Sequence, residues 1–212
     1  MDGSDRRERL ARSRLYLVLE ARPHGADPRP LLDAALRGGV DVVQLRDKEL
    51  ADQALVAAAD PFRTACEEHG ALFVLNDRPD LVEECGADGA HVGRSDMPVP
   101  DARALVGPDR LIGTSASTAA ELAAVGGADY VGVTAFATPT KEDAVAGGLE
   151  LLGDAARSLD VPWFAIGGVE LSTIGDVLAA GAPGVAVVRA IRDADDPETA
   201  ARLLRSALDR QE

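Results

Sequence analysis

Two hydroxyls and a lysine lie together in the segment Thr138-Pro-Thr140-Lys141, shortly after an apolar run that ends at Val133. Hydroxyl and ammonium groups donate hydrogen bonds to phosphate oxygens, and backbone N–H groups of nearby turns can add to such a site. Only one other lysine, Lys48, occurs in the chain, and it also follows an apolar, β-branched run. A lysine presents a compact, mobile charge, unlike the rigid fork of arginine. We therefore expect Lys48, Thr138, Thr140 and Lys141 to bind an anionic substrate.

Further polar side chains follow other apolar runs. Gln44, Arg46 and Lys48 alternate at and beyond one strand end, and the period of two in an extended segment places them on one side. The others are Asn76 and Asp77 after Ala71–Leu75, Asp96 after Gly89–Val92, and Ser115 after Leu111–Gly113. Singly, Asn76, Asp77 or Asp96 would also suit a turn or a helix N-cap. Their joint occurrence at strand ends indicates one site.

The two carboxylates of this set indicate a metal. A carboxylate beside a phosphate repels it unless a divalent cation lies between them. Mg²⁺ suits a site of one or two carboxylates completed by phosphate oxygens and water. We therefore expect Asp77 and Asp96 to bind Mg²⁺. A diphosphate would be surrounded by Arg46, Lys48, Ser115, Thr138, Thr140 and Lys141.

A second anion site is predicted from Gly167 and Gly168, which follow the apolar run Trp163–Ile166, and from Val188 and Arg189, at the end of the run Gly184–Val188. Backbone N–H groups at this position of a barrel often bind a monophosphate. The glycines could instead permit a tight turn, and Arg189 could pair with a nearby aspartate. Two anion sites predict two phosphorylated substrates.

Alternating apolar runs and helical patterns would position these residues. Strands are expected at Leu15–Leu19, Val40–Leu45, Ala71–Leu75, Gly89–Val92, Leu111–Gly113, Tyr130–Val133, Trp163–Ile166 and Gly184–Val188. Helices are expected at Pro30–Leu36, Asp52–His69, Pro100–Val106, Ala119–Val125, Leu149–Leu159, Thr173–Ala180 and Pro197–Leu208, with a short one opened by Pro79.

Eight nearly all-apolar strands, each followed by a helix or similar connection, predict a parallel sheet closed into a (β/α)8 TIM barrel. The barrel would span residues 14–212 as one domain after a polar lead-in of residues 1–13. A doubly wound sheet is the alternative, but the first strand lacks the glycine fingerprint that follows it in such folds. In a barrel the active site forms at the carboxyl ends of the strands, where every polar cluster above would lie.

Composition limits the possible partners. The 212 residues carry a net charge of −14, which argues against binding nucleic acid or an anionic membrane. No apolar stretch approaches the roughly 18 residues of a membrane span. The charged N-terminus lacks a signal core, so a cytoplasmic protein is expected, as a monomer or a homo-oligomer. Cys66 and Cys85 have no CxxC spacing and are expected to be buried thiols.

His91 is the only histidine expected near the carboxyl ends of the strands. It would serve as a packed imidazole or as a catalytic base. Trp163 would belong to the core or line a pocket.

Taken in order, several of these segments resemble the thiamine-phosphate synthase (thiamine-phosphate pyrophosphorylase) family from Leu15 to Ile191. The segments are VVQLRDK, VLNDRPDL, DGAHVGRSDMPV, IGTSAST, GADYVGV followed by TPTKEDA, and FAIGGV with GVAVVRAI. Each is weak alone, and the ordered set is specific.

The resemblance implies a (β/α)8 barrel that joins 4-amino-2-methyl-5-hydroxymethylpyrimidine diphosphate to a thiazole phosphate, forming thiamine phosphate and releasing diphosphate. It implies a dissociative reaction, in which the C–O bond to diphosphate breaks before the thiazole nitrogen attacks. Catalysis then consists of stabilising the departing diphosphate, and no Ser-His-Asp set is needed. The implied catalytic residues are Arg46, Lys48, Ser115 and Lys141.

The same resemblance assigns the binding residues. Implied contacts to the pyrimidine diphosphate are Gln44, Arg46, Lys48, Asn76, Ser115, Thr138, Thr140 and Lys141. Asp77 and Asp96 would hold Mg²⁺, and Gly168, Val188 and Arg189 would receive the thiazole phosphate.

The sequence departs from the family pattern at Leu19 and Glu20, where Thr-Asp is common, and at Arg189, where serine is common. One rival reading is a thiazole tautomerase-like isomerase, which would have no use for a metal and diphosphate site. Another is a non-catalytic binder of thiamine phosphates, which could lose the metal carboxylates.

Overall fold

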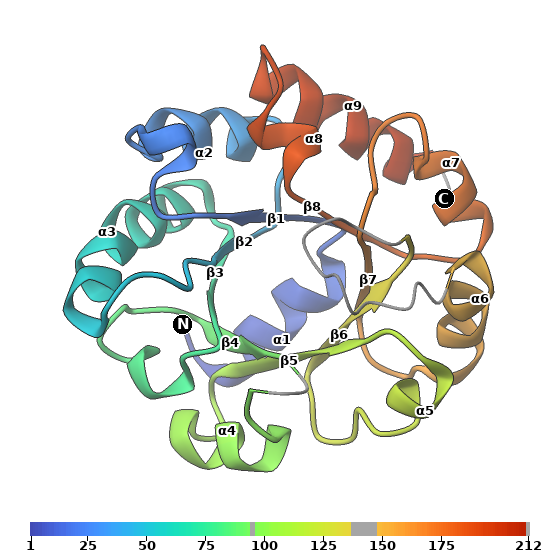
Figure 1. The fold of residues 1–212 in the computed structure, drawn as a ribbon, viewed down its shortest axis with the longest axis horizontal. Coiled ribbons are helices and arrows are strands. Elements are labelled where there is room, and N and C mark those ends of the chain that lie inside the picture. Colours follow the sequence, from blue (N-terminus) through green and yellow to red (C-terminus); the bar gives the residue numbers. More distant parts are fainter. Residues whose placement is uncertain (94–95, 137–147, 211–212) are drawn as a thin grey trace.

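The computed structural model describes residues 1–93, 96–136 and 148–210. Eight parallel strands close in sequence order into a barrel, with β1 hydrogen-bonded to β8, and helices surround the ring of strands (Figure 1). This confirms the predicted (β/α)8 fold. The strands are β1 (Leu15–Leu19), β2 (Val42–Leu45), β3 (Leu72–Asn76), β4 (Gly89–Val92), β5 (Leu111–Ala116), β6 (Tyr130–Thr134), β7 (Trp163–Ile166) and β8 (Val185–Val187).

Most helices follow the predicted order. The helices are α1 (Gly3–Arg12), α2 (Arg29–Arg37), α3 (Asp52–His69), α4 (Val99–Val106), α5 (Ala119–Leu122), α6 (Gly148–Ser158), α7 (Ile174–Ala179), α8 (Arg189–Arg192) and α9 (Pro197–Asp209), with 3-10 turns η1 (Pro23–Gly25) and η2 (Pro79–Leu81). Local chemistry sets several of their ends. Asp196 caps α9 by accepting from Thr199 N, and Gly70 ends α3 at a φ of 72°.

Side chains alternate between the two faces of each strand. On β1, Tyr16 and Val18 belong to the apolar cluster inside the barrel, whereas Leu15, Leu17 and Leu19 pack in the larger cluster between strands and helices. Both faces are covered, which is why the strands are nearly continuous apolar runs. Polar side chains inside the barrel are therefore exceptions that call for a reason.

Helix α1 lies within the segment expected to be a polar lead-in. Its Leu10 is 1% exposed and joins the cluster inside the barrel, so the helix packs across one end of the ring (Figure 1). Arg6 and Arg7 tie it down through ion pairs at 2.9 and 2.8 Å with Asp88 and Asp129. The helix was not predicted from the polar sequence, because the residues that anchor it are distant in the chain.

Three aspartates lie directly before strands β2, β4 and β6. Each accepts hydrogen bonds from backbone N–H groups at the start of the strand that precedes it in the chain, which is β1, β3 or β5. Asp41 accepts from Arg14 N and Leu15 N, Asp88 from Phe73 N, and Asp129 from Ile112 N, at 2.7–3.0 Å. An arginine pairs with each carboxylate: Arg205 with Asp41, Arg6 with Asp88, and both Arg7 and Arg103 with Asp129. These aspartates therefore join neighbouring strands at the amino-terminal end of the barrel.

Some boundaries differ from the predictions. Strand β5 continues to Ala116 because its pairing with β6 extends through Ser115↔Gly132, so Ser115 lies within the strand and not after it. Helix α5 ends at Leu122, and the short helix α8, which was not predicted, begins at Arg189 directly after β8. Among the described residues, no helix has the length and apolar character needed to cross a bilayer.

Candidate active site

Two carboxylates meet at the carboxyl ends of β3 and β4. A Cβ atom placed on Gly93 would lie 2.1 Å from an Asp96 carboxylate oxygen and 3.8 Å from one of Asp77, so both carboxylates flank this glycine. Gly93 N–H donates to Asp77 Oδ1 at 3.3 Å. Burial and the negative charge of Asp77 raise the pKa of Asp96 above its ordinary value. Two carboxylates this close together, one of which disfavours the charge of the other, suit a bound cation.

Several contacts hold Asp77 in place. Its backbone has a φ of 58°, a left-handed conformation that Asn and Asp tolerate better than most residues. Asn76 Nδ2 donates to its Oδ2 at 2.6 Å, and Lys48 Nζ lies 3.2 Å from the same oxygen. Although burial opposes the shift, the hydrogen bond from Gly93 N–H and the Lys48 ammonium keep the pKa of Asp77 below its ordinary value. Asp77 is therefore ionised at neutral pH.

The structure thus brings together Lys48, Asn76, Asp77 and Asp96, which come from three different β–α units. Within the described residues, no group of three or more His, Cys, Asp or Glu side chains could hold a metal ion. A pair of carboxylates is the donor set that Mg²⁺ uses when substrate phosphates and water supply its other ligands. The two aspartates fit Mg²⁺ on this ground, and their role as its ligands stays a prediction.

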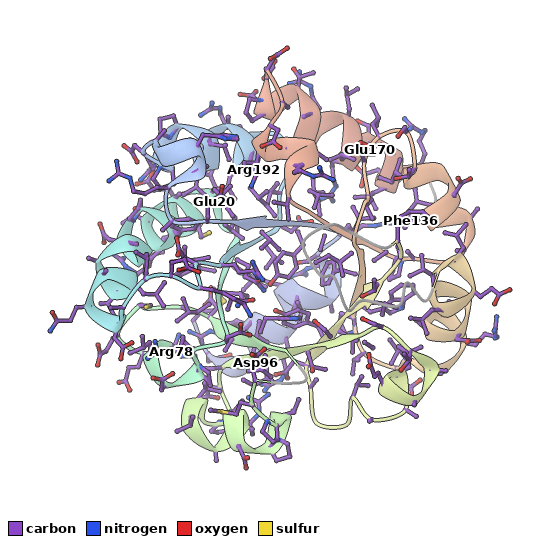
Figure 2. All side chains as sticks on the ribbon, in the orientation of Figure 1. Glu20, Arg78, Asp96, Phe136, Glu170 and Arg192 are labelled. Atoms are coloured by element: carbon purple, nitrogen blue, oxygen red, sulfur yellow. The ribbon has the colours of Figure 1, made fainter. Side chains whose placement is uncertain are left out.

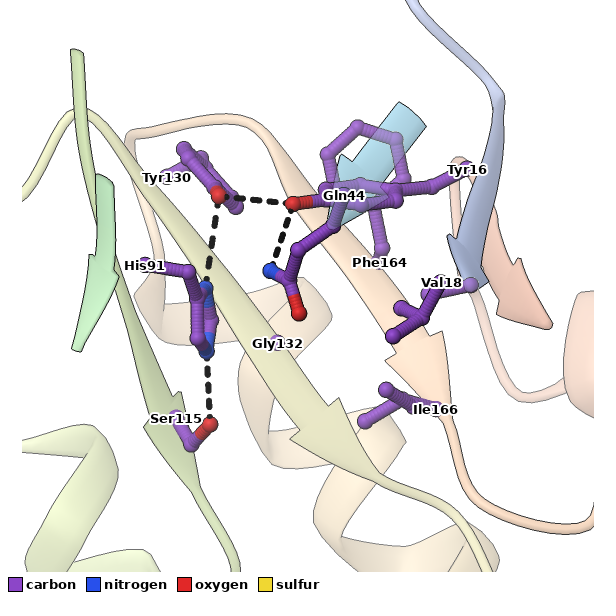
Figure 3. Close-up of a pocket in the computed structure, with 10 residues that line it drawn as sticks. Tyr16, Val18, Gln44, His91, Ser115, Tyr130, Gly132, Phe164 and Ile166 are labelled. Carbon is purple, nitrogen blue, oxygen red and sulfur yellow. Dashed lines mark hydrogen bonds between the residues drawn. The ribbon is translucent and has the colours of Figure 1, made fainter. Parts of the chain in front are cut away.

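A pocket opens inside the barrel (Figure 3), and the backbone carbonyl of its lining residue His91 accepts from Asp77 N at 2.8 Å. Gln44, 4% exposed, donates from Nε2 to the Tyr16 hydroxyl at 2.8 Å. His91 lies with Nδ1 3.3 Å from the Tyr130 hydroxyl and Nε2 2.8 Å from Ser115 Oγ. The pocket is lined by Tyr16, Val18, Gln44, His91, Ser115, Tyr130, Gly132, Phe164, Ile166 and Ala186. Its apolar walls and few polar groups suit a flat ring with hydrogen-bonding edges.

Glycines make room for this arrangement. A Cβ on Gly113 would lie 2.1 Å from the ring of Tyr130, so only glycine lets that ring lie across β5. Gly132 lies on β6 opposite Ser115, and a Cβ there would approach His91 Cε1 to 3.6 Å. The Tyr130 ring therefore occupies the space that a side chain at position 113 would fill, and it forms part of the pocket wall.

Two arginines near the carboxyl ends of the strands are not neutralised. In the part of the chain that the structure describes, Arg46, Arg189 and Arg210 are the only arginines whose guanidinium groups form neither a hydrogen bond nor an ion pair. Arg46 directly follows β2, and Arg189 begins α8 after β8. Because this protein is strongly acidic and pairs nearly all its arginines, these two unpaired charges suit an anionic ligand.

The residues of the predicted second anion site directly follow two adjacent strands, since β7 pairs with β8. Gly167 and Gly168 have φ values of 97° and 64°, and a Cβ on Gly168 would meet Phe136 at 3.2 Å. Both glycines are thus required by backbone conformation, and Val188 packs against the cluster inside the barrel. That these residues receive a phosphate stays a prediction.

Other predicted residues fall outside this grouping. Thr138, Thr140 and Lys141 lie outside the described residues. Glu20, a departure from the family pattern, pairs with Arg192 at 3.1 Å, and Figure 2 shows this pair across the barrel opening from Asp96. Cys66 and Cys85 are buried free thiols, as predicted.

Sequence reasoning missed Tyr16 and Tyr130, the only tyrosines in the chain. Each lies in an apolar run on the face that turns into the barrel. A hydroxyl-bearing aromatic inside such a run was the available signal, because a buried phenol needs a partner.

A closed (β/α)8 barrel whose strand ends carry paired carboxylates, unpaired cations and an apolar pocket defines the class: a barrel enzyme built for phosphorylated substrates. The family model for thiamine monophosphate synthase matches residues 15–191. The chain belongs to this family.

Individual relatives agree. A thiamine-phosphate synthase of Streptomyces avermitilis is 48% identical over 92% of this chain and 93% of its own length. One from a Nostoc species is 44% identical over 98% of this chain, which spans 59% of that longer protein. The solved thiamine phosphate pyrophosphorylase of Pyrococcus furiosus is 31% identical, with a TM-score of 0.85 over 96% of this chain and 98% of that one. The predicted family, fold and transferase class are confirmed.

Proposed function

We propose that this protein couples 4-amino-2-methyl-5-hydroxymethylpyrimidine diphosphate to 4-methyl-5-(2-phosphooxyethyl)thiazole, forming thiamine phosphate and diphosphate. The observation that carries the proposal is the meeting of Lys48, Asp77 and Asp96 beside the pocket that contains Gln44 and Ser115. The pyrimidine ring occupies the pocket, and its diphosphate extends toward the carboxylates.

In the proposed reaction the methylene C–O bond breaks first, and diphosphate leaves with the bonding electrons. The thiazole nitrogen then donates its lone pair to the methylene carbon, forming the C–N bond. Mg²⁺ held by Asp77 and Asp96 would supply charge neutralisation for the leaving diphosphate. Lys48 and Arg46 add positive charge, and Ser115 donates a hydrogen bond. Lys141, Thr138 and Thr140 are assigned to the same diphosphate on sequence grounds.

Binding of the thiazole phosphate is assigned to Gly168, Val188 and Arg189. The unpaired charge of Arg189 supports this assignment, since it stands where the family commonly has serine and has no carboxylate partner among the described residues. A cytoplasmic location remains part of the proposal.

The test is an assay of diphosphate release with both substrates and Mg²⁺, with each component omitted in turn. We expect release only when all three are present, with thiamine phosphate formed in equal amount. Conversion of the thiazole without diphosphate release would favour an isomerase. Binding of both compounds without any product would favour a non-catalytic binder.

A further inference from the structure

A continuous chain of hydrogen bonds crosses the inside of the barrel (Figure 3). It runs from Gln44 Nε2 to the Tyr16 hydroxyl at 2.8 Å and from there to the Tyr130 hydroxyl at 2.9 Å. It continues from Tyr130 to His91 Nδ1 at 3.3 Å and ends with His91 Nε2 at 2.8 Å from Ser115 Oγ. Each member comes from a different strand, so the closed barrel itself assembles the chain.

The chemistry of one end gives the chain a direction. Gln44 Nε2 only donates, so the Tyr16 oxygen accepts and the Tyr16 hydroxyl donates to Tyr130. Tyr130 in turn donates to His91 Nδ1. An imidazole that accepts at Nδ1 carries its hydrogen on Nε2, which then donates to Ser115 Oγ. The hydroxyl hydrogen of Ser115 is left to donate to a group outside the chain.

Burial makes this direction hard to disturb. Tyr16, Gln44 and Tyr130 are 3%, 4% and 1% exposed. Burial raises the pKa of both phenols above the ordinary tyrosine value, so both keep their hydroxyl hydrogens at neutral pH. In such an environment each hydrogen bond polarises the next, and an unmade bond is costly. All hydrogen bonds of this chain therefore reverse their donor-to-acceptor direction together or not at all.

We propose that Tyr16, Tyr130 and His91 are positioning residues that hold the Ser115 hydroxyl as a donor to the leaving diphosphate and link it to ring recognition at Gln44. The inference rests on the proposed function, in which Gln44 contacts the pyrimidine and Ser115 the diphosphate. A ring donor, such as the 4-amino group, that binds Gln44 Oε1 keeps Nε2 directed at Tyr16. Recognition of the ring at one end thus maintains the donor at the other.

The first test is the tautomer of His91, read from ¹⁵N chemical shifts in protein labelled at histidine. The His91 signals are assigned by their loss in His91→Gln. We expect a protonated Nε2 and an accepting Nδ1 in the free wild-type protein. In Tyr130→Phe the Nδ1 atom loses its donor, and both tautomers should be populated. A protonated Nδ1 in the wild type would overturn the proposal.

A matched control removes a buried hydroxyl that is not part of the chain. Thr114 neighbours Ser115 on β5, and its hydroxyl is bonded only to Val92 O, at 3.3 Å, among the described residues. Thr114→Val should leave both the His91 tautomer and kcat unchanged. If it shifts them as Tyr130→Phe does, the effect is general to the strand and the proposal fails.

The second test is a double-mutant cycle on kcat. Tyr130→Phe should lower kcat roughly 10-fold with little change in KM, the size expected for one hydrogen bond. In the Ser115→Ala background the same substitution should have no further effect, because Tyr130 acts only through Ser115. Additive losses would contradict the proposal. Tyr16→Phe breaks the chain one link earlier and should behave alike if Tyr130→Phe does not fold.

The proposed function and the role of the hydrogen-bonded chain can be refuted separately. A wild-type protein that does not couple the two substrates would refute the proposed function, while the His91 tautomer would still judge the chain. A wild-type protein that couples them, yet shows the reversed tautomer or additive losses, would refute only the chain.

Discussion

Asp77→Asn should lower kcat/KM for diphosphate release by about 10²- to 10³-fold, the loss typical of removing one group that stabilises a charged transition state. The variant removes one of the two charges that face each other across Gly93 and the partner of the Lys48 ammonium. Saturation with Mg²⁺ should also shift to higher concentration. The measurement is steady-state release across an Mg²⁺ titration.

Stability should change little in this variant. Asparagine tolerates the left-handed backbone at φ 58° and can still accept from Gly93 N–H. The ion pair it loses is half-exposed on the Lys48 side and contributes at most about 1 kcal/mol. Asp80→Asn is the matched control, since Asp80 lies in the same loop and pairs with Arg78. Near-normal activity of Asp77→Asn, or an equal loss in Asp80→Asn, would contradict a role specific to Asp77.

Asp129→Ala should reduce the free energy of unfolding by about 2–3 kcal/mol without altering the chemistry of the site. The carboxylate is 11% exposed and accepts from Ile112 N at 2.7 Å, from Arg7 at 2.8 Å and from Arg103. Its removal leaves a buried N–H and two arginines without their partner, and such losses cost about 3–5 kcal/mol when all groups are buried. Partial exposure of both arginines reduces the expected value.

Urea unfolding measures this change. Asp154→Ala is the control, because Asp154 pairs with Arg157 at 2.5 Å on an exposed face of α6. Its substitution should alter the free energy of unfolding by no more than about 0.5 kcal/mol. Equal effects of the two substitutions would show that the aspartates before even-numbered strands do not join the barrel as described.

The fold could be predicted because strands buried on both faces must be apolar along their whole length. Runs such as Leu15–Leu19 and Tyr130–Val133 therefore stood out from the helical segments between them. Helix α1 could not be found this way. Its segment contributes one buried leucine, Leu10, and its fixed position depends on aspartates more than 80 residues away.

The site could be predicted only in part. Topology alone places the ends of parallel strands at one face, and this was enough to predict that Lys48 would lie near Asp77. The hydrogen-bonded chain depends on which face of each strand turns inward and on the strand register. His91 bonds both Tyr130 and Ser115, and Tyr130 bonds Tyr16, only because the four strands that carry them are in the right register, which no single strand's sequence reveals.

Asp77 and Asp96 are proposed to hold a divalent cation that binds the leaving diphosphate. Crystals grown with Mn²⁺ in place of Mg²⁺, and with diphosphate, would locate the cation by anomalous scattering. We predict one Mn²⁺ bonded to an oxygen of each aspartate and to diphosphate, with Lys48 at the phosphate oxygens. A cation bound elsewhere, or diphosphate bound away from both carboxylates, would contradict the account.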